Sequence, residues 1–278
     1  MDSKNNSSRG RQGASNKSNP PKARFRKDFK KASPAKKADD ESAGIRLNKY
    51  IANSGICSRR EADKYIEQGS VSVNGELVVE MGYKVMPTDV VRFDGTSISP
   101  EQKRYVLLNK PKNYITTMDD ERGRKTVMEL VDNATKERIY PVGRLDRNTT
   151  GLLLFTNDGE LAKKLTHPKY NVRKLYQATL SKKFDMKDLQ KLKDDLIVIE
   201  GKKVFIDAAS YVEGQPKTEV GIEIHSGRNR IVRKIFEHLG YTVVKLDRVI
   251  FAGMTKKNLP RGRWRELTKL ELSNLKMI

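Results

Sequence analysis

The segment from Pro141 to Phe155 constrains the fold of this chain more than any other. It ends in a short apolar run, Leu152 to Phe155, which turn-forming residues follow. Such a run is typical of a buried β-strand. Arg144, Asp146 and Arg147 stand just before the strand, next to a Thr-Thr-Gly turn. The segment therefore predicts a rigid core strand that is entered from a charged loop.

The acidic residue of this loop is a candidate for chemistry. A carboxylate between two guanidiniums is expected to have a lowered pKa and to stay ionised at neutral pH. An ionised Asp146, fixed on a loop over a rigid strand, is a plausible nucleophile. Charge pattern alone favours a structural ion pair at the start of the strand, because such networks also perturb pKa values.

The order of residues in the loop points to a family. Gly143-Arg-Leu-Asp146, followed by Thr149-Thr-Gly-Leu-Leu153, resembles the catalytic loop of RNA pseudouridine synthases of the RsuA/RluB type. With the blocks below, the resemblance covers residues 45–267. It implies that Asp146 is the catalytic aspartate and that Arg144 fills the space left by a flipped uridine. It also implies a reaction that needs no cofactor.

The same resemblance assigns roles to residues further along the chain. Tyr176, in Lys174-Leu-Tyr, matches the tyrosine that stacks on the target uracil, although a strand tyrosine is about as often a core residue. Arg233 matches the basic residue that pairs with the catalytic aspartate, and Val232 an apolar residue beside the base. Arg228 and Arg230 are expected to contact RNA phosphate; without the resemblance they would be a solvated helix start.

Composition supports a nucleic-acid partner and argues against several other classes. Lys and Arg number 56 against 35 acidic residues, a formal net charge of +21, which is hard to explain without a polyanion. No apolar run approaches the roughly 18 residues of a membrane-spanning helix. The single Cys57 excludes an internal disulfide and fits a reducing cytoplasm. The three histidines lack metal-ligand spacing, so we expect no metal.

The first 44 residues are polar and basic and contain few apolar side chains. Such a segment cannot bury enough surface to offset its ordering entropy, so we expect a disordered tail. It is either a solubilising extension or a basic arm that adds phosphate contacts, and the basic chain behind it favours the arm.

Residues 45–98 predict a small domain of two short helices and a hairpin. Ser58 to Glu61 forms a capping-box pattern at the start of the second helix, and Asn74-Gly75 is a favoured hairpin turn. The segment resembles the RNA-binding domain named after ribosomal small-subunit protein S-four. The second helix carries the basic residues Arg59, Arg60 and Lys64. They either contact RNA phosphate or form an ordinary solvated face.

Residues 99–278 predict a larger catalytic domain. Strands are expected near residues 105–108, 152–155, 176–180, 218–225, 241–251 and 263–267, with helices near 158–165, from 228 onward and after 268. Strands and helices do not alternate regularly, which favours an α+β fold with a mainly antiparallel mixed sheet and flanking helices. The resemblance implies the same fold.

The sequence therefore predicts site-specific isomerisation of uridine to pseudouridine in ribosomal RNA, most consistent with 23S RNA of the large subunit. A 16S target in the small subunit and a non-catalytic RNA-binding or ribosome-assembly factor are the alternatives. A hydrolytic glycosidase would need a second carboxylate, and the matching blocks contain none. We expect a cytoplasmic monomer whose partner is ribosomal RNA, free or in an assembly intermediate.

Overall fold

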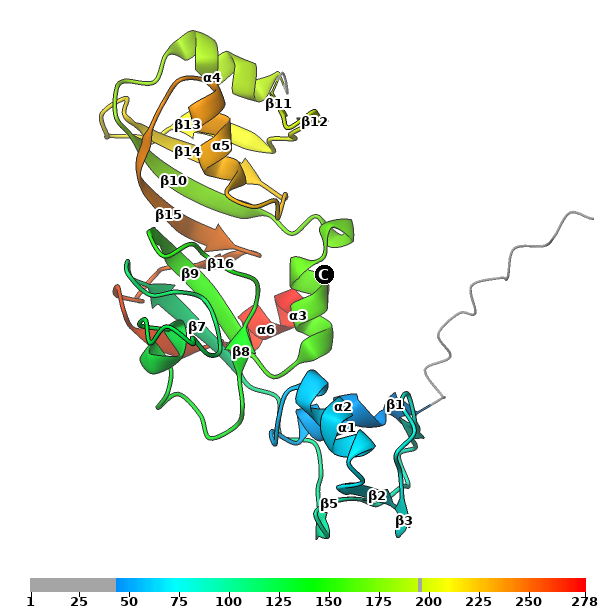
Figure 1. Cartoon of the computed structure of the whole chain (residues 1–278). Coiled ribbons are helices and arrows are strands. Elements are labelled where there is room, and N and C mark those ends of the chain that lie inside the picture. The colour runs from blue at the N-terminus through cyan, green and yellow to red at the C-terminus, as the bar shows by residue number, and fades with distance from the viewer. Residues whose placement is uncertain (1–43, 195–196) are drawn as a thin grey trace, which may run out of the picture. The chain divides into compact units, whose positions relative to one another are not determined.

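The computed structural model describes residues 44–194 and 197–278 (Figure 1). The predicted basic tail lies outside these ranges except for Gly44. Within the described ranges, no helix has the length and apolar character required to span a bilayer.

The N-terminal region is built from two short helices, α1 (Leu47–Asn53) and α2 (Arg59–Glu67), and several short strands. The predicted capping box of α2 is confirmed. Ser58 Oγ accepts from the backbone N–H of Glu61 at 3.3 Å, and a Glu61 carboxylate oxygen accepts from the N–H of Ser58 at 2.7 Å. The strands are β1 (Ile45–Arg46), β2 (Val71–Val73), β3 (Glu76–Leu77), β4 (Lys84–Val85), β5 (Val91–Phe93) and β6 (Thr96–Ser97).

A four-stranded sheet of order β3-β2-β5-β6 and the pair β1-β4 surround the small core of this region. The hairpin turn between β2 and β3 forms at Asn74-Gly75, as predicted, with positive φ angles of 54° and 92°. Leu47, Ile51 and Ala62 from the helices are almost fully buried in this core. The apolar side chains of both helices therefore face this core.

The larger region is organised on one sheet of order β13-β14-β10-β15-β9-β7-β17, with β16 paired to β15 and β8 to β9. Every pair in it is antiparallel except β15 with β9, so the predicted mainly antiparallel mixed sheet is confirmed. The strands are β7 (Tyr105–Lys110), β8 (Tyr140–Pro141), β9 (Thr149–Thr156), β10 (Lys174–Leu180), β13 (Ala208–Tyr211), β14 (Glu219–Ile224), β15 (Val243–Phe251), β16 (Met254–Thr255) and β17 (Trp264–Glu266). A separate small pair joins β11 (Val198–Ile199) to β12 (Lys202–Lys203).

Helices cover the two halves of this sheet (Figure 1). Side chains of α4 (Met186–Lys193) and α5 (Ile231–His238) share one core with β10, β13 and β14. Side chains of α3 (Gly159–Thr166) and α6 (Lys269–Lys276) share another with β7 and β9. Two 3-10 helices, η1 (Val127–Leu130) and η2 (Pro168–Tyr170), complete the region.

The central strand β9 is buried on both faces. Leu152 and Leu154 pack in the core beneath α3 and α6, whereas Leu153 and Phe155 pack in a third core beside η1. Alternate residues of a strand point to opposite faces, so an unbroken apolar run is the pattern of a strand that is covered twice. The predicted buried strand is therefore present, and it supports the loop that carries Asp146.

Candidate active site

The Asp146 loop connects β8 to β9 and is fixed at both ends. Leu145 is buried in the core beside η1, and the hydroxyl of Thr116 donates to its carbonyl oxygen at 2.8 Å. The backbone N–H of Thr149 donates to the carbonyl of Asp146 at 3.0 Å, which closes a turn. The Asp146 side chain is 38% exposed. The backbone is thus held firmly while the carboxylate stays accessible.

A buried lysine at the end of β7 anchors this loop. Lys110 is fully buried, and its ammonium donates to the carbonyl oxygens of Pro111, Asp146, Arg147 and Thr149, at 3.1, 3.1, 3.4 and 2.9 Å. Burial lowers the pKa of Lys110 to about 8, although the Asp146 carboxylate acts in the opposite direction. No role was assigned to this lysine in the sequence analysis.

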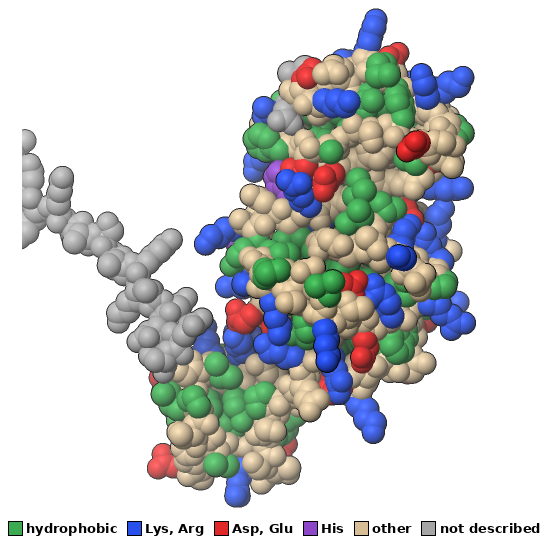
Figure 2. Space-filling view, turned by 180° about the vertical axis from the view of Figure 1, so that it is seen from behind, with side chains coloured by type: hydrophobic (Ala, Val, Ile, Leu, Met, Phe, Trp, Pro, Cys, Tyr) green, Lys and Arg blue, Asp and Glu red, His purple; other side chains and the backbone are tan. Residues whose placement is uncertain are grey.

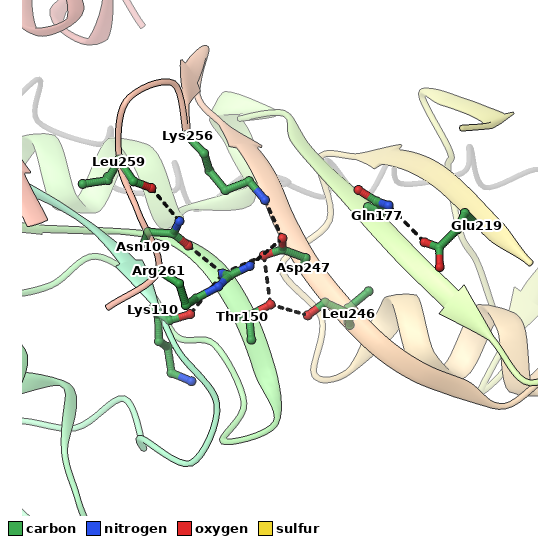
Figure 3. A network of polar contacts seen from close by, with 10 residues as sticks. All are labelled: Asn109, Lys110, Thr150, Gln177, Glu219, Leu246, Asp247, Lys256, Leu259 and Arg261. Atoms are coloured by element: carbon green, nitrogen blue, oxygen red, sulfur yellow. Dashed lines mark hydrogen bonds and ion pairs between the residues drawn. The ribbon is translucent and has the colours of Figure 1, made fainter. Parts of the chain in front are cut away.

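A polar cluster holds β9 and β15 together where they run parallel (Figure 3). Asp247 accepts two hydrogen bonds from Arg261, at 2.9 and 3.1 Å, and one from the Thr150 hydroxyl at 2.9 Å; it also pairs with Lys256. Arg261 donates in turn to the side-chain oxygen of Asn109 at 2.6 Å. Burial raises the pKa of Asp247, but the bonds from Arg261 and Lys256 outweigh it and hold that pKa below its ordinary value.

The other side of the site comes from β10 and from the start of α5. Arg230 stands at the N-cap of α5 in the left-handed conformation, with φ 50° and ψ 27°. Its guanidinium lies 3.8 Å from a carboxylate oxygen of Asp146. Tyr176, on β10, is half-buried and packs against two of the cores. Val232 is buried on the first turn of α5.

Arg230 takes the place of the three arginines that the sequence analysis placed beside Asp146. Arg144 and Arg147, its neighbours in the loop, are exposed and make no ion pair with it among the described residues. Arg233 was expected to pair with it, but its guanidinium is buried and donates to the carbonyl of Val243 at 2.8 Å. Burial lowers the pKa of Arg233, and the nearby Arg230 lowers it further, while Asp146 raises it.

Arg228 is engaged by the protein itself. Its guanidinium donates to the carbonyl of Ile199 at 2.8 Å and lies 3.5 Å from Glu200. Glu200 also pairs with Lys234 on α5. Arg228 therefore fixes the loop before α5 as well as presenting positive charge. Only the contact with RNA phosphate was predicted in the sequence analysis.

These elements surround a cavity of about 500 Å³, within the usual range for ligand sites. The predicted residues that line it are Arg144, Asp146, Tyr176, Arg228, Arg230 and Val232. Six cationic side chains line the cavity against one carboxylate: Arg144, Arg147, Lys174, Arg228, Arg230 and Arg248. A site of this charge suits an anionic ligand such as a nucleic-acid strand. Lys and Arg side chains are also spread over the surface seen in Figure 2.

The remaining predicted residues lie elsewhere. Arg59, Arg60 and Lys64 are exposed on α2 in the N-terminal region. Arg59 and Arg60 open that helix, and Arg59 also donates to the side-chain oxygen of Asn48 at 3.5 Å. They are available to a ligand, as the sequence led us to expect.

Comparison with known proteins decides the family. The model of the RNA pseudouridylate synthase family matches residues 104–238, and that of the S4 domain matches residues 45–91. The chain is 41% identical over 235 residues to the ribosomal large subunit pseudouridine synthase B of Bacillus subtilis, covering 84% of this chain and 96% of that one. The chain belongs to the RNA pseudouridine synthase family.

Further relatives agree with this assignment. The dual-specificity RNA pseudouridine synthase RluF of Escherichia coli is 36% identical over 240 residues, which cover 84% of this chain and 79% of that protein. A crystal structure of a pseudouridylate synthase superimposes with a TM-score of 0.59 at 29% identity and covers 84% of this chain and all of the other. This pseudouridine synthase therefore combines an S4 RNA-binding domain with a catalytic domain of the family fold, and the predicted enzyme class is confirmed.

Proposed function

We propose that this pseudouridine synthase isomerises one uridine of 23S ribosomal RNA, with Asp146 as its catalytic carboxylate. The observation that carries the proposal is the position of Asp146. An accessible carboxylate on an anchored loop lies 3.8 Å from the Arg230 guanidinium, and both line a basic cavity that Tyr176 also lines. The identity to a relative named for the large ribosomal subunit supports the choice of RNA.

The reaction detaches uracil from carbon 1′ of the ribose, turns it, and rejoins it through carbon 5. Asp146 attacks carbon 1′ or stabilises the positive charge that develops there, as carboxylates do in glycosidases. Arg230, 3.8 Å from that carboxylate, orients it. The cavity must also exclude water, because hydrolysis would leave an abasic site.

The base has to leave its stack before Asp146 can reach the sugar. In our proposal Tyr176 stacks on the extruded uracil, Val232 packs beside it, and the exposed Arg144 fills the space that the base vacated. Arg233 is buried on the same helix, where it donates to the carbonyl of Val243. These roles account for an aromatic, an apolar and a cationic side chain at one cavity.

RNA outside the cavity is held by charge. Arg228 and Arg230 present positive charge at the cavity rim, and the exposed cations of the S4 domain extend the contact. Phosphate contacts of this kind set affinity and register but carry little sequence information. The S4-domain residues to which we assign phosphate contacts are Arg59, Arg60 and Lys64.

Pseudouridine mapping of ribosomal RNA, by carbodiimide block and primer extension, tests the proposal in cells with and without this gene. We expect one site in 23S RNA to be lost and to return with the wild-type gene but not with Asp146→Asn. The purified Asp146→Asn protein should bind the target RNA nearly as well as the wild type. A lost site in 16S RNA would overturn the choice of substrate, and substantial turnover by Asp146→Asn would overturn the assigned carboxylate.

A further inference from the structure

Two cations, the partly buried Lys174 and the buried Arg248, flank the tyrosine of the cavity on the face of the sheet that lines it. Lys174 stands two residues before Tyr176 on β10, so both side chains point to the same face. Arg248 on β15 is the Cα partner of Tyr176 in the neighbouring strand. All three line the cavity. Neither cation has a role in the function proposed above.

Lys174 is held in place by backbone oxygens alone. Its ammonium donates to the carbonyls of Val172 and His225 at 3.0 and 2.9 Å, which leaves one of its three N–H groups for a further acceptor. Burial, and then the charge of Arg248, lowers the pKa of Lys174 to about 8. The side chain therefore still carries its proton at neutral pH.

Arg248 is held equally firmly and keeps one donor free. Its side chain is 3% exposed, its Nε donates to the carbonyl of Leu152 at 2.8 Å, and its guanidinium lies 4.4 Å from the ring centre of Phe251. Its Nη2 atom is buried and has no acceptor in the described part of the chain. A buried donor without a partner is costly, so an acceptor arriving beside it would bind strongly.

The charge of this pair is not neutralised by the protein. No carboxylate oxygen of the described residues lies within ion-pair distance of Lys174 or Arg248. Asp207, whose charge acts on Lys174, is already bonded to the ring of His225 at 2.9 Å. Asp146 is the one carboxylate on the cavity lining, and its partner is Arg230.

We propose that Lys174 and Arg248 stabilise the uracil anion that forms when the glycosidic bond breaks. The inference rests on the proposed function. The electron pair of the C1′–N1 bond leaves with the base, so uracil carries a negative charge spread over N1, O2 and O4. Asp146 balances the positive charge of the sugar while the two cations, fixed behind Tyr176, meet the charge of the base.

The remaining steps then balance without another reactant. The turned anion forms the C1′–C5 bond with its own electron pair, carbon 5 gives up its proton, and N1 takes one up. Because the cations are already in place, they need no reorganisation as the charge develops. They also hold the free base in the cavity, from which it could otherwise escape between the breaking of the C1′–N1 bond and the formation of the C1′–C5 bond.

An RNA phosphate is the competing ligand for two cations. The burial of Arg248 argues against this ligand. Phosphates lie on the outside of an RNA strand, whereas Arg248 is only 3% exposed. The two ligands predict different kinetics. A phosphate contact acts on binding, whereas an anion site acts on the chemical step once the RNA is bound.

The test compares Arg248→Met and Lys174→Met with the wild type in single-turnover reactions at saturating enzyme. The RNA is the ribosomal fragment that contains the mapped uridine, carrying either uridine or 5-fluorouridine at that position. Loss of the N-linked nucleoside is read by nuclease digestion and mass spectrometry. Lys182→Met is the control, because Lys182 lies over the ring of Tyr241, outside the cavity lining.

We expect each variant to lose about 100-fold in rate on uridine, with RNA affinity within about twofold of the wild type. Fluorine withdraws electrons and makes the departing uracil a better leaving group, so the loss on 5-fluorouridine should be smaller by about tenfold. Arg248→Lys, which keeps the charge but lacks the guanidinium, should retain more activity than Arg248→Met even if both proteins are less stable.

Three outcomes would overturn the inference. An equal loss on both substrates would mean that the residues only support the structure, and weaker RNA binding with an unchanged saturating rate would mean that they bind phosphate. Failure of the proposed function is a separate result: the wild type itself would then form no pseudouridine. Wild-type activity together with unimpaired variants would remove this inference alone.

Discussion

Replacing Lys110 with methionine should have two measurable effects, one on the catalytic rate and one on stability. Methionine has a similar length but cannot donate to the carbonyl oxygens of Asp146, Arg147 and Thr149, which Lys110 holds in place. The loop would then lose the fixed position of its carboxylate, and a displacement of about 1 Å can reduce a rate roughly 100-fold. We expect a loss of about that size in single-turnover rate, with RNA affinity little changed.

The stability effect has a distinct dependence on pH. Burial lowers the pKa of Lys110 from 10.5 to about 8, an interval that corresponds to roughly 3 kcal/mol at about 1.4 kcal/mol per pH unit. Below pH 8 both folded and unfolded chains carry this proton, so the full penalty for burying the charge is present. Between pH 8 and 10.5 the unfolded chain holds a proton that the folded chain has lost, so stability rises with pH.

Methionine does not titrate, and Lys174, whose pKa is also about 8, is present in both proteins. The difference in unfolding free energy between the two proteins therefore reports the titration of Lys110 alone. The free energy of unfolding of the wild type, minus that of Lys110→Met, should rise by up to roughly 3 kcal/mol across this window. The single tryptophan, Trp264, packs beside the core of β7 and β9. Its fluorescence in urea titrations, below pH 8 and near pH 10.5, measures the difference. A constant difference, or a wild-type rate in folded Lys110→Met, would refute the reasoning.

Three further predictions address other parts of the chain. Gly151→Ala should lower the free energy of unfolding in urea by about 3 kcal/mol or more. The reason is that a Cβ at this position, where φ is +109°, would lie 2.3 Å from the carbonyl oxygen of Arg248. Gly253→Ala, at a φ of +80° with open space around it, should lower the free energy of unfolding by less. Ser58→Ala removes the cap of α2 and should lower stability by about 1 kcal/mol in thermal melts followed by circular dichroism, and unchanged melting would contradict the role of the cap. Deleting residues 1–44 should weaken binding of the target RNA and flatten its salt dependence without changing the chemical step, whereas an unchanged slope would count against a basic arm.

Features that depend on a few neighbouring residues were predictable from the sequence. The capping box at Ser58, the hairpin turn at Asn74-Gly75 and the twice-covered strand β9 each follow from local patterns, and the structure contains all three. Residues 181–217 gave no such signal. Their described part forms α4, the four-residue strand β13 and the strands β11 and β12, and these last two, of two residues each, are too short to show a period.

The partner of Asp146 could not be predicted, because helical spacing does not fix where a helix begins. The apolar positions place Ile231 and Val232 on the buried side of α5 but leave open whether Arg230 lies inside the helix. In the structure Arg230 is the N-cap and reaches the cavity, whereas Arg233, one turn later, is carried against β15. Family resemblance favoured Arg233; the backbone conformation at Arg230 decides the geometry.

Buried cations were missed for a related reason. A lysine at the end of an apolar strand, such as Lys110, has the same local pattern as one that ends in solvent, since long side chains can extend to either. Three of the four acceptors of Lys110 are carbonyls about forty residues away, and that of Arg248 lies on β9, nearly a hundred residues away. Only the folded sheet brings these partners together, so sequence patterns cannot reveal them.

The parallel junction of β9 and β15 connects these observations. Three residue pairs form it, and they include Thr149, the first residue of β9 after the Asp146 loop, and Arg248, the partner of Tyr176. Asp146 therefore belongs to one half of the sheet, and the groups that meet the base belong to the other. The polar cluster of Asp247 and Arg261 clamps the halves at this point. Because the junction is short and clamped by charge-assisted bonds, it fixes the separation between sugar-facing and base-facing groups more tightly than either loop could alone.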